Sequence, residues 1–455
     1  MVTGSLLIVI FVASLLSLFL LILKFKWDPF LALIAVAIAT GLAVGIPYTE
    51  LPGTITGGFG STLTGVGIMI GLGVMFGELL AASGAIERIA ASLLKAFGIK
   101  RSPLAIAVTG TAVSIPVFFD AAFVILINLI RKLSEKTKIS MVTFVTALAV
   151  GLIVTHSLVP PTPGPLVVAD NTKSPLGWFI FYSLLTAIPA VLVGGWWYGL
   201  RAGKNSPAYT PEDGGEDHNA THQQVAAAAS DRAEIGTGLS YFLLLLPIIL
   251  ILANTIVSLI VPSTVTADLF GFIGEKNVAL FISVLVAAFI LRPYLRDSQK
   301  NLFAKAIASA GLIILITGAG GAFGGVIKAS GIGDYLVEVM QTWNMPVILL
   351  GFIFSQILRA SLGSTTVALV TTSSILGPMV ADLGVSPILL GLAICAGGVG
   401  LSLPNDSGFW VVNKFAKLSV PDTLKTWTVG GSLAGLAALG AIYVLSLFQG
   451  VLPGL

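Results

Sequence analysis

The sequence is poor in charge, cysteine and histidine, and each shortage excludes a class of protein. Only 10% of the 455 residues are Asp, Glu, Lys or Arg, and 56% are hydrophobic, whereas a soluble domain carries roughly 25% charged residues. The single cysteine, Cys395, excludes an internal disulfide and a cysteine cluster for a metal. The net charge of +3, without a basic stripe interleaved with aromatics, argues against a nucleic-acid partner.

Motifs for ATP-driven or metal-dependent chemistry are missing as well. The chain has no glycine-rich P-loop, so ATP would have to act through another subunit, and it has no His-Glu-x-x-His motif. Two of the three histidines, His218 and His222, lie in a polar stretch and are interpreted as solvated residues. No cofactor and no metal site is predicted. An intramembrane hydrolase is disfavoured because no nucleophile and base stand at close spacing.

Long apolar runs dominate the rest of the chain and indicate an all-α polytopic membrane protein. A hydrocarbon core is crossed by about 20 apolar residues, and the mean hydropathy of the whole chain is +1.00. The first run is followed, not preceded, by basic residues, so it is interpreted as a first span rather than a cleaved signal peptide. Ten spans are predicted: Leu6–Leu23, Pro29–Ile46, Ser61–Ala82, Met141–Ala169, Leu176–Leu200, Leu239–Val261, Asn277–Leu291, Ala306–Ile327, Pro387–Leu403 and Trp427–Leu447.

Two further apolar segments are too short for a pair of spans. Residues 103–130 are interrupted by Ser114, Pro116 and Asp120 and have basic clusters at both ends. Two spans would need about 40 residues, and positive charge favours the cytoplasmic side for both ends. We therefore predict a re-entrant hairpin with its tip at 114–120, the alternative being one long span. Residues 346–378 form the matching second hairpin.

One offset of 247 residues aligns the two halves of the chain without a gap. Charge asymmetry orients the two halves oppositely in the membrane, which predicts an inverted repeat. The first repeat is residues 1–200, divided into scaffold spans at 1–60 and transport-domain elements at 61–175; a cytoplasmic polar linker at 201–238 precedes the second repeat at 239–455. The offset superimposes Ser83 on Ser330, Gly77 on Gly324, Ser114 on Ser361, Gly151 on Gly398 and Thr155 on Ser402.

Each repeat also contains a helix that its own sequence must break. Residues 155–165 hold four prolines and a glycine within the predicted helix at 141–169, and proline removes an amide donor and clashes with the preceding turn. The second broken helix, 387–413, is interrupted near Pro404. Irregular backbone at membrane depth is tolerated only where protein or a water-filled cavity satisfies it, so both breaks predict a binding site. The alternative is a kink or a surface loop.

The polar residues at the two tips and two breaks define a candidate site for an organic anion, because helix N-termini suit a carboxylate. Arg359 could hold that carboxylate or form a structural ion pair with Asp406 or Asp120. Asp406 could equally cap the broken helix, and any single Ser or Thr could bond its own helix instead. Asp120 and His156 are the candidates for proton coupling. The substrate-binding candidates are Ser114, Thr155, His156, Ser157, Arg359, Ser361, Gly363, Ser364, Thr365, Asn405, Asp406 and Ser407.

Several short sequence motifs in the chain resemble those of the gluconate permease family of proton symporters. They are the Thr-His-Ser and proline run at 155–165, the tip at 115–120, the Leu-Arg-Ala-Ser-Leu-Gly-Ser run at 358–364 and Asn-Asp-Ser-Gly-Phe-Trp at 405–410. The resemblance implies uptake of gluconate or a related sugar acid with protons across a bacterial inner membrane. It also implies the ion transporter superfamily, whose members are typically homodimers with a fixed scaffold and a transport domain that moves as an elevator.

The resemblance leaves the cargo and the coupling ion open. Some relatives carry Glu where Asp120 stands, and members of the family differ in cargo among gluconate, other aldonates, glycerate and serine. Sodium coupling is the alternative to protons, and glycerate, lactate or serine are the alternatives to a sugar acid. A channel is disfavoured because an inverted repeat with broken helices is typical of alternating access.

Overall fold

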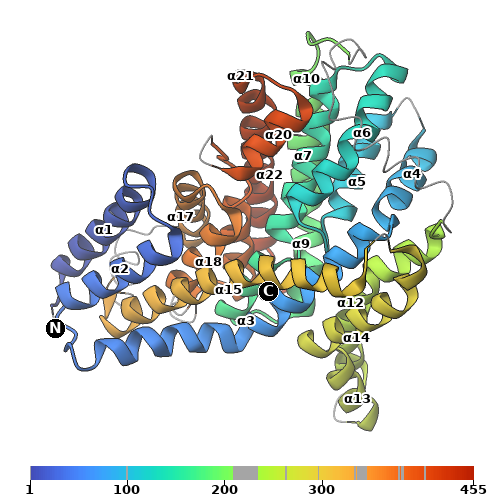
Figure 1. The fold of residues 1–455 in the computed structure, drawn as a ribbon. Coiled ribbons are helices and arrows are strands. Elements are labelled where there is room, and N and C mark those ends of the chain that lie inside the picture. Colours follow the sequence, from blue (N-terminus) through green and yellow to red (C-terminus); the bar gives the residue numbers. More distant parts are fainter. Residues whose placement is uncertain are drawn as a thin grey trace.

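The computed structural model describes residues 2–98, 101–208, 234–261, 264–295, 297–332, 335, 346–377, 380, 384–403 and 406–455. These residues form helices and no strand; one isolated antiparallel bridge joins Ser140 and Ala208. Most of the predicted linker, 209–233, lies outside the described residues, and so do most of residues 332–343, whose alternation of apolar and polar residues is typical of an amphipathic helix. The all-helical class predicted from the apolar runs is confirmed (Figure 1).

Two long helices, α3 (Leu51–Ala82) and α15 (Gln299–Ala329), pack along each other, and other helices pack against this pair (Figure 1). Glycine permits their close crossing: a Cβ on Gly58 would lie 2.5 Å from the Gly321 carbonyl oxygen. Both helices begin earlier than their apolar runs suggest. As a result α3 continues unbroken through residue 60, where the sequence suggested a boundary between scaffold and transport elements.

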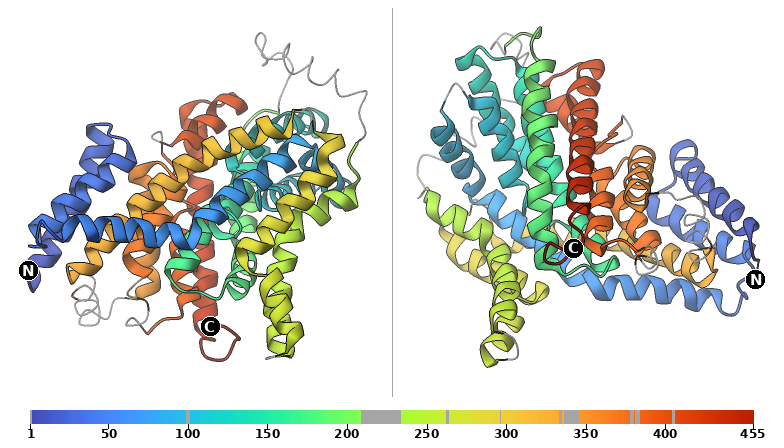
Figure 2. Two further views of the ribbon diagram at one scale, coloured as in Figure 1. Left: turned by 60° about the horizontal axis from the view of Figure 1, so that its bottom comes forward. Right: turned by 180° about the vertical axis from the view of Figure 1, so that it is seen from behind.

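Shorter helices lie at the two ends of the α3–α15 pair, as the views in Figures 1 and 2 show. At one end are α1 (Ser5–Phe19), continued by η1 (Leu20–Lys24), and α2 (Pro29–Ala43). At the other end are α12 (Thr237–Ile260), α13 (Val265–Ile273) and α14 (Lys276–Leu291). The sequence did not predict α13, because nine residues are too few to stand out as a span.

The two predicted hairpins are pairs of helices with a break where the tip was expected. α5 (Ser102–Val113) ends just before Ser114, and α6 (Phe119–Thr137) begins after Phe118. α17 (Val347–Leu362) and α18 (Thr365–Leu376) are separated by two residues. The turn between them needs Gly363, whose φ of 67° lies in the left-handed region that glycine adopts without strain.

Each of the two predicted broken helices is divided into two helices, the first at Pro160 and Pro161; Pro404 and Asn405 of the second lie outside the described residues. α7 (Met141–Leu158) and α8 (Pro163–Asn171) flank the first break, and α19 (Pro387–Gly397) and α20 (Ser407–Ala416) flank the second. Every residue of α7 is buried, so this helix lies at the centre of the packed core. Proline at the start of α8 and α19 is favourable because the first helical amide needs no partner.

The remaining helices complete the bundle around α7. They are α4 (Ala85–Phe97), α9 (Leu176–Ala190) with η3 (Val191–Trp197) and α10 (Tyr198–Ala202), and α21 (Val420–Thr423) with η7 (Leu424–Thr428) and α22 (Val429–Ser446). α4 is amphipathic and buries Ile86 and Ile89, which lie on its apolar face. In the described part of the chain six helices are long and apolar enough to cross a membrane, or seven if the two segments of α3, bent by 45°, count as one.

Replacing Gly151 with alanine should destabilise the bundle, because a Cβ there would collide with the Ala107 carbonyl oxygen where α5 crosses α7. Overpacking a close-packed interior typically costs about 1–3 kcal/mol. Thermal unfolding in detergent measures the effect. Gly60→Ala is the matched control, since nothing lies within 4 Å of its added methyl group. Equal melting temperatures for the two variants would contradict the close α5–α7 packing.

Candidate functional site

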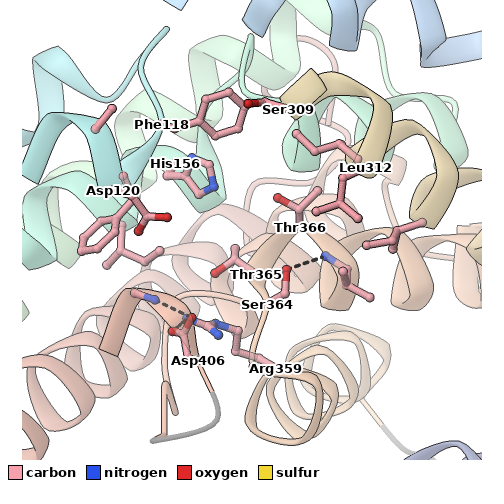
Figure 3. A pocket seen from close by; sticks show the side chains of 18 of the residues that line it. Phe118, Asp120, His156, Ser309, Leu312, Arg359, Ser364, Thr365, Thr366 and Asp406 are labelled. Carbon is pink, nitrogen blue, oxygen red and sulfur yellow. Dashed lines mark hydrogen bonds and ion pairs between the residues drawn. The ribbon is translucent and has the colours of Figure 1, made fainter. Parts of the chain in front are cut away.

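A cavity of about 420 Å³ lies where both tips and both broken helices meet (Figure 3). Three helices begin at its wall: α6 at Phe119, α18 at Thr365 and α20 next to Gly408. The N-terminus of a helix carries unpaired amides and a partial positive charge. The arrangement therefore favours an anion, as the breaks in the sequence suggested.

Arg359, near the end of α17, is the one permanent cation among the described residues that line this cavity. Its side chain is almost completely buried, and its Nη2 donates to Asp406 Oδ2 at 2.5 Å. Its Nε and Nη1 have no hydrogen-bond partner in the part of the chain that the structure describes. Buried donors without partners are costly, more so on a charged group, so the guanidinium group has unused capacity for a ligand that accepts hydrogen bonds.

Asp406 is held by several donors at once. It caps α20, since its Oδ1 accepts the amide of Gly408 at 3.0 Å, and its Oδ2 accepts the Ser402 hydroxyl in addition to Arg359. Ser402 in turn accepts Trp427 Nε1 at 2.5 Å. Asp406 therefore has both of the structural roles that the sequence suggested for it. It is a helix cap and also the ion-pair partner of Arg359.

Asp120 and His156 lie together on another part of the cavity wall (Figure 3). Asp120 is in the first turn of α6 and its side chain is exposed, whereas His156 is only 8% exposed and its Nδ1 has no hydrogen-bond partner. The Phe118 ring is 5.8 Å from the imidazole, centroid to centroid. The structure thus brings together the two residues that the sequence suggested for proton coupling.

The second hairpin tip supplies backbone and hydroxyl groups to the cavity. Gly363, Ser364 and Thr365, all predicted, line it together with Thr366, the next residue of α18. Ser364 caps α18 by accepting the amide of Val367, and the Thr365 hydroxyl donates to Gly398 O at 3.4 Å. These hydroxyl groups provide polar partners close to Arg359.

Three other candidates do not line this cavity. The Ser114 hydroxyl donates to Val117 O at 3.3 Å within the first tip, and the Ser157 hydroxyl donates to Cys395 O at 2.7 Å, which joins α7 to α19. Thr155 is fully buried and its hydroxyl has no partner. Asn405 lies outside the described residues, and of Ser361 and Ser407 only the backbone is described.

Part of the wall comes from segments that the sequence did not assign to the site. α15 contributes a polar residue, Ser309, and an apolar group of three, and α3 contributes Glu78. η7 contributes Trp427, whose ring centroid is 4.6 Å from that of Phe119. Glu78 does carry a local signal, because it is an ionisable residue inside an apolar run. The other residues carry none, because they lie inside ordinary apolar helices and reach the cavity only through packing. The apolar group on α15 is Leu312, Ile313 and Ile316.

Comparison with known proteins agrees with this architecture. The chain is 36% identical to the Inner membrane permease YgbN of Escherichia coli, over 94% of this chain and 96% of that protein. It is 32% identical to the Gluconate permease of Bacillus subtilis, over 97% of this chain and 99% of that protein. Among solved structures it resembles the YdaH transporter of Alcanivorax borkumensis with a TM-score of 0.59 and 16% identity, over 89% of this chain and 88% of that one, a likeness in fold.

The GntP family permease model matches residues 6–448, nearly the whole chain. The relatives are permeases, which confirms the prediction of an inner-membrane, multi-pass transporter rather than an enzyme. With a family match over this length and full-length relatives above 30% identity, the chain belongs to the GntP family of membrane permeases.

Proposed function

We propose that this permease imports gluconate or a related small hydroxylated carboxylate by proton symport, with alternating access to the cavity at Arg359. The observation that carries the proposal is the buried guanidinium group, which has two nitrogens without partners and faces a cavity. A carboxylate can accept hydrogen bonds from one of these two free nitrogens and from the second proton of Nη2. The volume of about 420 Å³ is within the range of small-molecule sites.

The hydroxyl-bearing tip favours a polyhydroxylated cargo over an apolar acid. Ser364, Thr365 and Thr366 line the cavity beside Arg359, and Ser309 faces them from α15 (Figure 3). A site that hydrogen-bonds hydroxyl groups of its ligand rejects an analogue that lacks them, because the protein groups are then left unpaired. We therefore favour a sugar acid, the kind of substrate printed in the name of the Bacillus subtilis relative.

The charge balance of the wall supports coupling to protons. Glu78, Asp120 and Asp406 line the cavity against the single cation Arg359, which is already paired with Asp406. With Glu78 and Asp120 both ionised, an entering anion is repelled. A proton on Asp120 removes one of these charges, so anion and proton should bind together and leave together. His156, beside Asp120, is the second candidate to carry the proton.

The same proposal includes the finer architecture suggested by the sequence. The offset of 247 residues carries the start of α3 onto that of α15, the start of α5 onto that of α17, and the start of α7 onto that of α19, each within a few residues. This supports two repeats at 1–200 and 239–455 joined by a linker. We propose that these repeats are inverted and that an elevator movement of the transport-domain elements against the scaffold spans exposes the cavity in turn. A homodimer is proposed from the family resemblance.

Uptake of labelled gluconate into proteoliposomes tests the function. We expect accumulation above equilibrium under an imposed pH gradient without sodium, and collapse of the gradient by a protonophore should abolish it. Competition by glycerate, lactate and serine ranks the cargo classes. Accumulation only when sodium is supplied would show that sodium, not the proton, is the coupling ion. A lack of uptake and of competition under both gradients would refute sugar-acid symport.

A further inference from the structure

A second cavity, of about 680 Å³, lies at the other end of α18 from the candidate site. The first cavity is lined by residues 363–367 at the start of α18, and the second by Ser374 and Gly377 at its end. Along α15 the first cavity takes residues 309–316 and the second takes residues 321–328. The two cavities therefore follow one another along the seam between α15 and α18.

Close packing separates the two cavities. A Cβ on Gly320 would lie 2.9 Å from Val370 Cγ1, and a Cβ on Gly324 would lie 2.6 Å from the Ser374 carbonyl oxygen. Such spacing leaves no passage for a solute between α15 and α18 in this arrangement. The second cavity is thus a separate compartment, with its own lining and its own chemistry.

The lining of the second cavity carries positive charge that nothing in the described chain neutralises. Lys173, directly after α8, and Lys328, near the end of α15, both line it and are exposed. Neither forms an ion pair, and no Asp or Glu is among the described residues that line the cavity. Two ammonium groups at one cavity without counter-charge attract an anion.

The neutral part of the lining favours a small soluble anion over a lipid. Hydroxyl and amide groups come from Ser61, Thr62, Asn171 and others, and glycines make up much of the rest. Asn171 is fixed by donating to Ser373 Oγ at 2.9 Å and to Ser374 Oγ at 3.3 Å. Acyl chains would need an apolar wall, but among the described residues of the lining only Val380, Val385 and Pro387 are larger apolar residues.

We propose that this second cavity is an anion-binding site at which Lys173 and Lys328 hold a small soluble carboxylate. Resting on the proposed function, we assign it to the transported sugar acid, bound at the end of α18 remote from Arg359. A weak, salt-sensitive site of this kind raises the local concentration of the cargo without competing with the tighter site. The phosphate of a lipid headgroup is also an anion that two lysines could bind. The experiment below distinguishes a lipid phosphate from the soluble carboxylate.

Ligand-observed NMR on the full chain in nanodiscs of zwitterionic lipid measures the site directly. In Arg359→Gln, which removes the first site, gluconate should still bind weakly, and binding should fall as salt is raised. Adding Lys173→Gln and Lys328→Gln should abolish that residual binding. The double variant Lys204→Gln/Lys300→Gln is the matched control, because it removes two exposed lysines that line neither cavity. If Arg359→Gln does not fold, gluconate is titrated into the protein with Arg359 intact, and the weaker of its two binding phases is compared with and without the two cavity lysines.

Residual gluconate binding that persists without the two cavity lysines would overturn the proposal. So would lysine-dependent binding of phosphatidylglycerol in anionic nanodiscs that gluconate does not displace, since the site would then belong to a lipid. Inorganic phosphate is a probe that does not depend on the identity of the cargo. Lysine-dependent phosphate binding in a protein that fails to take up gluconate would refute the proposed function while leaving the anion site standing.

Discussion

Arg359→Lys is expected to weaken gluconate binding by about 10- to 150-fold, since the single ammonium group of lysine cannot replace the guanidinium donors on the ligand while keeping the bond to Asp406. One hydrogen bond to a charged group contributes about 1.5–3 kcal/mol, and each 1.4 kcal/mol is about tenfold in affinity. Arg359→Gln, which removes the positive charge, should abolish detectable uptake. Binding by isothermal titration and uptake by proteoliposomes measure the two effects.

Loss of fold must be separated from loss of the ligand contact. Removing Arg359 alone leaves Asp406 as a buried charge without a counter-ion, and breaking such a pair typically costs about 3–5 kcal/mol. In the double variant Arg359→Gln/Asp406→Asn both charges are gone, so the melting temperature should recover towards the wild type. Binding should stay lost in that variant. Gluconate affinity equal to the wild type in the double variant would show that Arg359 serves only the fold.

Asp120→Asn should abolish accumulation driven by a pH gradient while leaving exchange of external for internal gluconate intact. The amide resembles the protonated carboxyl group in shape and charge but cannot release a proton. In the wild type, raising the pH ionises Asp120, adds a negative charge to the cavity wall and weakens binding of the anion. In the variant the affinity should therefore change much less with pH, and it should exceed that of the wild type at high pH.

Two other carboxylates test whether the effect belongs to Asp120. Asp268→Asn, an exposed change in α13 away from the cavity, should leave accumulation unchanged. Glu78→Gln alters the other unpaired carboxylate in the cavity wall and should retain accumulation if Asp120 carries the proton. Full accumulation in Asp120→Asn, with loss in Glu78→Gln or His156→Ala, would transfer the role to that residue.

Local sequence alone determined where this chain bends and breaks. The first tip falls between Val113 and Phe119 and the first helix break between Leu158 and Pro163, both where expected. Proline, glycine and isolated polar residues act on the backbone within a turn or two, so their effect is visible without the fold. The apolar runs also determined the helical class, because only helices satisfy the backbone across a span within one segment.

Only the tertiary structure decided which side chains meet at the cavity. Arg359 and Asp406 pair across 47 positions, and Ser309 reaches the cavity from a helix whose sequence is otherwise ordinary. Ser157, in contrast, is one residue from His156 yet bonds to α19 instead of facing the cavity. A one-residue step rotates a helical side chain by about 100°, so the side to which each residue turns depends on how distant helices pack. The local sequence thus determined where the helices break, and the packing of distant helices determined which residues face one another across those breaks.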